Sequence, residues 1–233
     1  MARQVRSEAT RRKILDAAID VFGEVGYAAA AWGTIIERTG MTKGAMYHHF
    51  DSKESLASAI IEEGSDTIFL AFRNVCGSAS PALENMIHGT FTIADVLSAD
   101  RTTRAAEQLV FSLTGFNEAA ARFYAGCVEL MTAEASRASA EGDLRPDLDP
   151  AMVSETIVGA ILGTRLLSNA IPNRDLHGDL MRRTSELWEL LLSGIVTEAS
   201  LPYFRQFLIR GALRYAEKAA APRVESELAS EVT

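Results

Sequence analysis

The spacing of apolar residues along the chain sets the strongest limit on its fold. These residues recur every three or four positions through most of the sequence, which is the period of an α-helix, and strand-like alternation is nearly absent. In the first such segment Ile14, Phe22 and Val25 share one face, and Gly26 supplies a left-handed stop. We therefore expect an all-α protein whose first helix covers about residues 7–25.

Two short helices are expected after this first one. The first covers about residues 33–39 and buries its isoleucines, and Gly40 then turns the chain. Thr42 is placed to cap a further helix that ends near His49. Two short helices separated by a glycine turn form a helix-turn-helix.

The rest of the sequence indicates longer helices joined by loops. Their expected bounds are about 53–75, 81–98, 101–114, 118–140, 150–171, 178–197 and 203–220. Residues 222–233 have the composition of a disordered tail.

Some positions within these helices carry local signals. Residues 51–54 have the acid-x-x-Glu form of a capping box, and Leu70 should lie on the apolar face of the helix that follows. Gly64 should weaken that helix midway. Gly159 and Gly163 lack side chains, so another helix can approach closely at these positions.

Charge is distributed unevenly along the chain. The whole protein carries a formal charge of −8, with a net +2 on residues 1–53 and −10 on the remainder. Phosphate affinity comes mainly from lysine and arginine, so only the N-terminal segment suits a nucleic acid. Its first residues concentrate this charge against a single acid, Glu8: Arg3, Arg6, Arg11, Arg12 and Lys13.

Several classes of protein find no support in the sequence. Cys76 and Cys127 are far apart and belong to no metal-ligand cluster, so we expect two buried thiols, no metal and no cofactor. No HExxH, GxSxG or glycine-rich phosphate loop points to an enzyme. Without a signal-peptide pattern, and with Glu155 and Arg165 interrupting the most apolar helix, we expect a cytoplasmic protein that does not enter a membrane.

The most informative segment is Met41-Thr-Lys-Gly-Ala-Met-Tyr-His-His-Phe50, followed by Ser52-Lys-Glu-Ser-Leu56. Its order and position resemble the recognition-helix segment of the tetracycline-repressor (TetR) family. The resemblance implies a helix-turn-helix DNA-binding domain over residues 1–52 and a larger helical domain for ligand binding and dimerisation over residues 53–221.

The polar residues of this segment are the candidate DNA contacts. Thr42 and the amides that follow it can hold a phosphate, Lys43 adds charge, and Gly44 lets the backbone approach DNA. Ala45 and His48 are the candidates for base readout, while Met46 and Phe50 should be core. The complete candidate set is Thr34, Thr42, Lys43, Gly44, Ala45, Tyr47, His48, His49 and Lys53. In the alternative interpretation, Tyr47 and His49 are packing residues between domains.

The loop before the supporting helix departs from the family pattern. Family members commonly place Thr or Ser there as a cap and phosphate donor, whereas this chain reads Ala28-Ala-Ala-Ala-Trp32. The resemblance therefore predicts fewer DNA contacts from this loop than in its relatives.

The middle helices supply large apolar side chains that suit a ligand pocket. The candidates are Phe69, Phe72, Met86, Phe91, Phe111, Phe116, Phe123, Tyr124, Cys127, Met131 and Trp188. The alternative for each is an ordinary core position. Trp188 in particular can reach the pocket floor or pack in a dimer core.

Within the family the chain is similar to the γ-butyrolactone receptors. The similarity lies in the opening Met-Ala-Arg-Gln-x-Arg, Thr-Lys-Gly-Ala, the Gly163-Thr-Arg165 step and Glu-Leu-Trp188. Those receptors usually carry a tryptophan in the helix that here contains Phe123, and this chain has none there.

Together these resemblances imply a transcriptional repressor. It would bind a palindromic double-stranded operator as a homodimer through residues 151–171 and 178–197, and a small hydrophobic or amphipathic effector would release it. A helix-turn-helix activator remains an alternative, and an enzyme using the helical-domain pocket is a more distant one.

Overall fold

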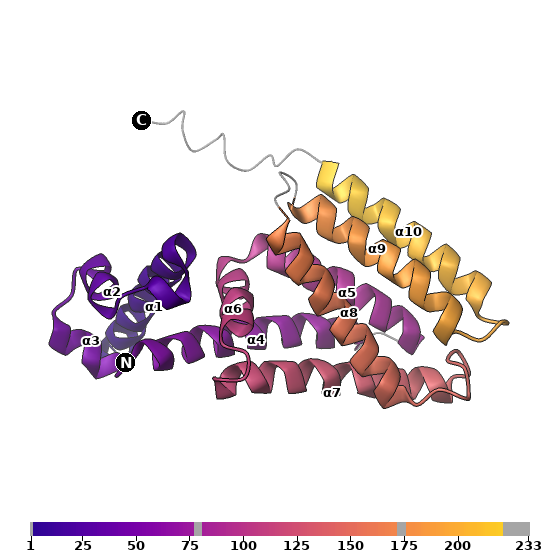
Figure 1. Ribbon diagram of the computed structural model, residues 1–233, viewed down its shortest axis with the longest axis horizontal. Coiled ribbons are helices and arrows are strands. Elements are labelled where there is room, and N and C mark those ends of the chain that lie inside the picture. Colours follow the sequence, from indigo (N-terminus) through magenta and orange to yellow (C-terminus); the bar gives the residue numbers. More distant parts are fainter. Residues whose placement is uncertain (1, 77–80, 172–175, 221–233) are drawn as a thin grey trace. The chain divides into compact units, whose positions relative to one another are not determined.

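The computed structural model describes residues 2–76, 81–171 and 176–220, and every regular element in these ranges is a helix (Figure 1). The only strand-like pairing in these ranges is an isolated antiparallel bridge between Leu144 and Val196. The helices are α1 (Ala2–Ala29), α2 (Trp32–Thr39), α3 (Lys43–His49), α4 (Lys53–Cys76), α5 (Ala82–Ala99), α6 (Arg101–Ser112), α7 (Glu118–Ala140), α8 (Pro150–Ala170), α9 (Leu176–Ile195) and α10 (Leu201–Ala220). The predicted all-α class is confirmed, whereas the predicted tail over 222–233 lies outside the described residues.

The chain folds into two compact units that do not follow its order. The first contains Met1–Gly77 and Asp95–Met131, and the second contains Ser78–Ala94 and Thr132–Thr233. Two of the crossings between units fall inside helices α5 and α7. The boundary at residue 52 stays a prediction.

In the first unit, α1 packs on α2 through a core that includes Ile14 and Ile35. The predicted stop at Gly26 takes the form of a kink, because this residue has a φ of 76° while helical structure resumes as far as Ala29. Val25, expected on the apolar face, is 53% exposed. The kink ends the regular helix directly after it, so Val25 lies beyond the part of α1 that the core covers.

The contact between α4 and α6 gives Gly64 a role that the sequence did not indicate. Gly64 is buried, and a Cβ added to it would lie 2.3 Å from the Cβ of Ala106 on α6. The missing side chain therefore allows two helices to pack closely, in addition to its cost in helix propensity. Leu70 is 57% exposed, so its expected place on the apolar face of α4 was wrong.

The start of α4 also differs from the expected capping box. Ser52, rather than Asp51, accepts from the helix: its Oγ takes a hydrogen bond from the Ser55 amide at 3.0 Å, and the Ser55 Oγ takes one from the Ser52 amide at 3.2 Å. The reciprocal pairing is that of a capping box, displaced by one residue and closed by Ser55 instead of Glu54.

In the second unit, α9 packs against both α8 and α10 (Figure 1). The joint between α8 and α9 contains a buried carboxylate, Asp179, which accepts from the Ser168 Oγ at 3.2 Å, Arg182 at 2.8 Å and Arg183 at 2.6 Å. Burial alone would raise the pKa of Asp179, but the hydrogen bonds from Arg183, Arg182 and Ser168 outweigh it and lower that pKa to about 2.

The other face of α8 has no partner within the described part of the unit. Met152, Leu166 and Leu167 are about half exposed there, and no atom lies within 4 Å of a Cβ added at Gly159 or Gly163. By length and composition α8 is also apolar enough to cross a membrane, and a third of that stretch is buried in the protein.

Candidate nucleic-acid interface

The candidate recognition helix α3 begins and is held as its sequence predicts. The Thr42 Oγ1 accepts a hydrogen bond from the Ala45 amide at 3.2 Å, and Gly40 turns the chain before it with a φ of 65°. A further fixing contact was not foreseen: the buried Thr39 donates to the Ile36 carbonyl at 2.7 Å and accepts from the Met41 amide at 3.1 Å. Thr39 thereby sets the turn between the two helices.

α3 separates its core residues from its candidate DNA contacts. Met46 is fully buried and Phe50 nearly so, which confirms both as core residues. The exposed positions are Thr42, Lys43, Gly44, Ala45, Tyr47 and His48, while His49 is half-buried. Tyr47 is 46% exposed, so within its own unit it is not a packing residue of the interior.

Aromatic and cationic groups contact one another across this exposed surface. The Tyr47 ring lies 5.9 Å from the Trp32 ring in an edge-on arrangement and 5.8 Å from the Lys43 Nζ. The His48 and His49 rings are 5.5 Å apart. Such contacts restrict the side-chain rotamers before any DNA is bound.

Lys53 has a structural role that the sequence did not indicate. Its Nζ donates to the carbonyls of Tyr27 at 2.8 Å and Ala30 at 3.0 Å, and it lies 4.4 Å from the centre of the Tyr27 ring. It therefore ties the start of α4 to the end of α1. Contact with a phosphate through the remaining N–H stays a prediction for this residue.

The start of the supporting helix α2 has the composition that distinguished the sequence from its family. Ala31 occupies the cap position and offers no side-chain hydrogen bond, while Thr34 is exposed on the first turn. The Nε1 of Trp32 is buried and has no hydrogen-bond partner in the described part of the chain.

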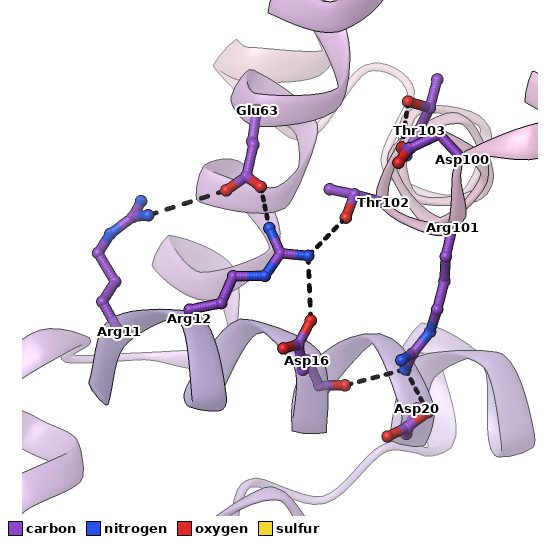
Figure 2. Close-up of polar contacts among 9 residues, drawn as sticks. All are labelled: Arg11, Arg12, Asp16, Asp20, Glu63, Asp100, Arg101, Thr102 and Thr103. Carbon is purple, nitrogen blue, oxygen red and sulfur yellow. Dashed lines mark hydrogen bonds and ion pairs between the residues drawn. The ribbon is translucent and has the colours of Figure 1, made fainter. Parts of the chain in front are cut away.

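Two of the α1 arginines, Arg11 and Arg12, have partners that their local sequence did not indicate. Figure 2 shows Arg11 and Arg12 directed toward Glu63 of α4, and Arg12 also contacts Asp16 at 3.1 Å and the Thr102 Oγ1 of α6 at 3.0 Å. Burial lowers the pKa of Arg12, but Asp16 and Glu63 outweigh it and raise that pKa overall. The sequence missed Glu63 and Thr102 because they lie far from Arg12 along the chain.

Arg101 also joins α1 and α6, but its side chain extends from α6 to α1. Arg101, at the start of α6, donates to the Asp16 carbonyl at 3.1 Å and to the Asp20 carboxylate of α1 (Figure 2). Asp100 caps α6 by accepting from the Thr103 amide at 2.6 Å. We call Arg12, Asp16, Asp20, Glu63, Arg101 and Thr102 the α1–α6 network.

The effector candidates in the first unit fall into an aromatic group and one outlier. Phe69 stacks on Phe123 at 5.9 Å, with the rings inclined by 15°, and the Tyr124 OH is 2.8 Å from the Thr114 Oγ1. Phe72 and Met131 are buried, and Phe111 and Cys127 are half-buried. Phe116 is 86% exposed, because it follows the positive-φ Gly115 in the turn between α6 and α7, so its expected pocket position was wrong.

Neither cysteine is the fully buried thiol that the sequence predicted. Neither Cys76 nor Cys127 forms a disulfide within the described residues, and both are half-buried. Burial of the Cys127 sulfur raises its pKa to about 12, which keeps it a neutral thiol at physiological pH. Within the described ranges, no group of three or more His, Cys, Asp or Glu side chains could hold a metal ion.

The remaining candidates, Met86, Phe91 and Trp188, belong to the second unit and are fully buried. The Trp188 Nε1 donates to the Thr90 Oγ1 at 2.9 Å, and Thr90 donates in turn to the Ile87 carbonyl at 2.7 Å. Trp188 thus packs α9 against α5 within one chain and offers no surface to a partner, contrary to a place in a dimer core.

Comparison with known proteins is consistent with this arrangement. Residues 14–60 match the family model for bacterial regulatory proteins of the tetR family, and residues 80–197 match that for the tetracyclin repressor-like C-terminal domain. The A-factor receptor protein of Streptomyces griseus is 30% identical over 99% of this chain and 80% of its own length. The UidR regulator of Escherichia coli K12 is 25% identical over 69% of this chain and 82% of its own.

Solved structures give the same result. A γ-butyrolactone receptor described as an ArpA-like protein superposes with a TM-score of 0.74 at 28% identity, covering 90% of this chain and 99% of the other. CprB of Streptomyces coelicolor, solved in complex with its operator sequence, superposes with a TM-score of 0.70 at 28% identity over the same shares.

Proposed function

The chain belongs to the tetR family of bacterial regulatory proteins, and from this premise we propose that it is a transcriptional repressor that binds a palindromic operator as a homodimer and leaves it when a small molecule binds. The observation that carries the proposal is the division of α3 into a buried side, Met46 and Phe50, and an exposed side of polar and small residues. That division presents one helix face to a major groove.

Each exposed residue then has a distinct role at the DNA. Lys43 contacts the phosphate backbone, and Gly44 allows the helix to approach it closely. Ala45 and His48 lie against base edges and contribute to sequence readout. Tyr47 and the partly exposed His49 donate to phosphates at the edge of the groove.

The open face of α8 is the proposed centre of the dimer. Gly159 and Gly163 lie on it with the half-exposed Met152, Leu166 and Leu167, and nothing in the described chain lies within 4 Å of a Cβ added at either glycine. A second copy that packs there would remove these side chains from water, and the two glycines would let the helices approach closely. The same pairing would exclude α8 from a membrane.

The proposed effector is a small hydrophobic or amphipathic molecule, with a γ-butyrolactone as the class to test first. Support comes from relatives described as an A-factor receptor and as γ-butyrolactone receptors. The stacked Phe69 and Phe123 offer an apolar surface in the first unit.

The α1–α6 network is the proposed path from effector to DNA. Arg12 of α1 contacts Thr102 of α6, and Arg101 of α6 contacts the Asp16 carbonyl of α1. A displacement of α6 would therefore also displace α1, the first helix of the proposed DNA-binding domain. These ion pairs are about half exposed, so each contributes only about 0.5 kcal/mol to folding. Their proposed role is to make α1 and α6 move together, rather than to stabilise the fold.

The decisive experiment measures binding of the purified protein to DNA from its own upstream region at fixed salt. Lys43→Ala should weaken binding to all DNA, and Ala45→Glu should abolish operator binding because it places a charge against the groove. Ala125→Glu adds the same charge to an exposed position of α7 and should leave binding unchanged. Normal operator binding by Ala45→Glu would overturn the proposal.

The same assay tests the release. A synthetic γ-butyrolactone with an alkyl side chain should dissociate the wild-type complex, and Arg101→Ala should need a higher concentration of it while its unfolding free energy changes little. If Arg101→Ala responds like the wild type, the network does not transmit the signal.

A further inference from the structure

The supporting helix α2 begins without a hydrogen-bonding side chain. Residues 28–31 are all alanine, the cap residue Ala31 makes no side-chain hydrogen bond, and the residue that follows is Trp32. The cap position can therefore neither cap the helix nor donate a hydroxyl to DNA, although Thr34 lies exposed on the first turn. A contribution of residues 28–32 to DNA binding must use a different kind of contact.

Trp32 provides such a contact because it connects α2 to the recognition helix. Its ring meets the Tyr47 ring edge-on at 5.9 Å, with an angle of 61° between the planes. The other neighbour of Tyr47 is the Lys43 ammonium, 5.8 Å from the ring centre. Trp32, Tyr47 and Lys43 thus form a row from the supporting helix to the exposed surface of α3.

The inner end of this row is fixed. On one side of Trp32, the Lys53 Nζ at the start of α4 donates to the carbonyls of Tyr27 and Ala30. The Ala31 carbonyl accepts a hydrogen bond from the amide of Ile35, a residue whose side chain is fully buried. The backbone on both sides of Trp32 therefore has little freedom to move. The anchored indole of Trp32 can therefore fix the orientation of the Tyr47 ring, and that ring can fix the position of the Lys43 ammonium.

The indole N–H takes no part in this row. The Trp32 Nε1 is buried and has no acceptor in the described chain, so the contact with Tyr47 depends on the shape of the ring. A buried donor without a partner costs stability, and phenylalanine removes that donor while it keeps an aromatic ring, although a smaller one, at this position. Phenylalanine should then be able to replace Trp32.

We propose that Trp32 is a positioning residue for DNA binding, which orients Tyr47 and, through it, Lys43 toward the backbone phosphates of the operator. The proposal rests on the proposed function, because it assumes that α3 is the DNA reader. In this proposal, the contact between Trp32 and Tyr47 supports phosphate binding in place of the capping hydroxyl that family members commonly carry before α2.

The test compares Trp32→Leu, Trp32→Phe, Lys43→Ala and the Trp32→Leu, Lys43→Ala double variant in operator binding across a salt series. Trp32→Leu should weaken binding about tenfold, the effect of losing an aromatic contact and one aligned charge. It should lower the salt slope by about one, as Lys43→Ala does. The double variant should lose less affinity than the product of the two single losses, because both changes remove the Lys43 contact, and its salt slope should equal that of Lys43→Ala. Trp32→Phe should bind within about twofold of the wild type.

The salt slope separates positioning from a merely structural role, because general destabilisation of the fold leaves the number of phosphate contacts unchanged. Should Trp32→Leu fail to fold, Tyr47→Leu removes the next ring in the row from an exposed position and should cause the same loss of slope. An unchanged slope in Trp32→Leu or its replacement would overturn the proposal. So would a Trp32→Phe variant as weak as Trp32→Leu, since the N–H would then be the group in use.

Failure of this inference can be told from failure of the proposed function by including Ala45→Glu in the same series. If Ala45→Glu abolishes binding while Trp32→Leu has no effect, α3 is the reader and the positioning role alone is wrong. If Ala45→Glu binds normally, α3 is not the reader and both fail.

Discussion

Several helices of this protein carry glycine at an interior position, and α4 and α8 show the two extremes of what surrounds such a residue. In α4, Gly64 lies so close to α6 that an added Cβ would be 2.3 Å from the Ala106 Cβ. In α8, nothing in the described chain lies within 4 Å of such an atom at Gly159 or Gly163. The same sequence signal marks a filled contact in one helix and an open face in the other.

The comparison shows what a small residue in a helix does and does not specify. It indicates that another backbone can approach closely, but the identity of that backbone depends on the tertiary arrangement. For α4 the partner belongs to the same chain. For α8 the proposed partner is a second copy, and this difference can be tested by substitution.

The largest effect is expected from Gly64→Leu. The new side chain would have to displace Ala106 and the α6 backbone at Thr103 and Thr102, so the free energy of unfolding should fall by about 3 kcal/mol. Chemical denaturation measures this change. Thr67→Leu, at an exposed position of α4, is the matched control and should cost much less; equal losses would mean that the α4–α6 contact is not tight.

A smaller effect should come from the inner side of α8, where Ser168 meets Asp179. Asp179→Asn removes the charge that Arg182 and Arg183 share, and the free energy of unfolding at neutral pH should fall by about 2 kcal/mol. Because the pKa of Asp179 is depressed to about 2, its stabilising contribution is complete above its unfolded pKa of about 4 and is lost as the pH falls toward 2.

Unfolding measured between pH 2 and pH 7 therefore distinguishes the wild type from Asp179→Asn. The difference between them should be constant from about pH 5 upward and should shrink at lower pH. A difference that does not depend on pH would show that shape, rather than charge, holds this joint.

The smallest effect is expected from Gly159→Ala. With no neighbour to displace, the added methyl should raise the unfolding free energy of the monomer by about 0.5–1 kcal/mol. If a second copy packs on α8, the same methyl should weaken the dimer several-fold in analytical ultracentrifugation. Gly23→Ala, an exposed and open helical position on α1, should give the gain in stability without the change in dimerisation.

The parts of the structure that the sequence predicted are those set by neighbours along the chain. Helical periodicity placed the helices, and the cap of α3 followed from Thr42 and Gly40 because both act on residues within one turn. The buried pair Met46 and Phe50 followed from the same local pattern.

What the sequence could not predict depends on residues far apart in the chain. Arg12 looked like a free cation until Glu63 and Thr102 were placed beside it, and Lys53 looked like a DNA contact until it was found on the carbonyls of Tyr27 and Ala30. Phe116 lies between two helices that the sequence predicted, and its hydrophobicity alone was no evidence that it enters a pocket. Side-chain type predicted the available chemistry, and tertiary contacts decided how it was used.

The division of the chain into two interleaved units has a practical consequence for experiments that transfer helices α1 to α4 to another regulator. Residues 95–131 return to the unit that residues 1–77 begin, and α6 covers the side of α4 that contains Gly64. A fragment cut after residue 77 would lack α6 and expose that side of α4 to water. A chimaera that borrows this reader should therefore include α6 and the first half of α7 from the same parent, so the exchangeable module is discontinuous in the gene.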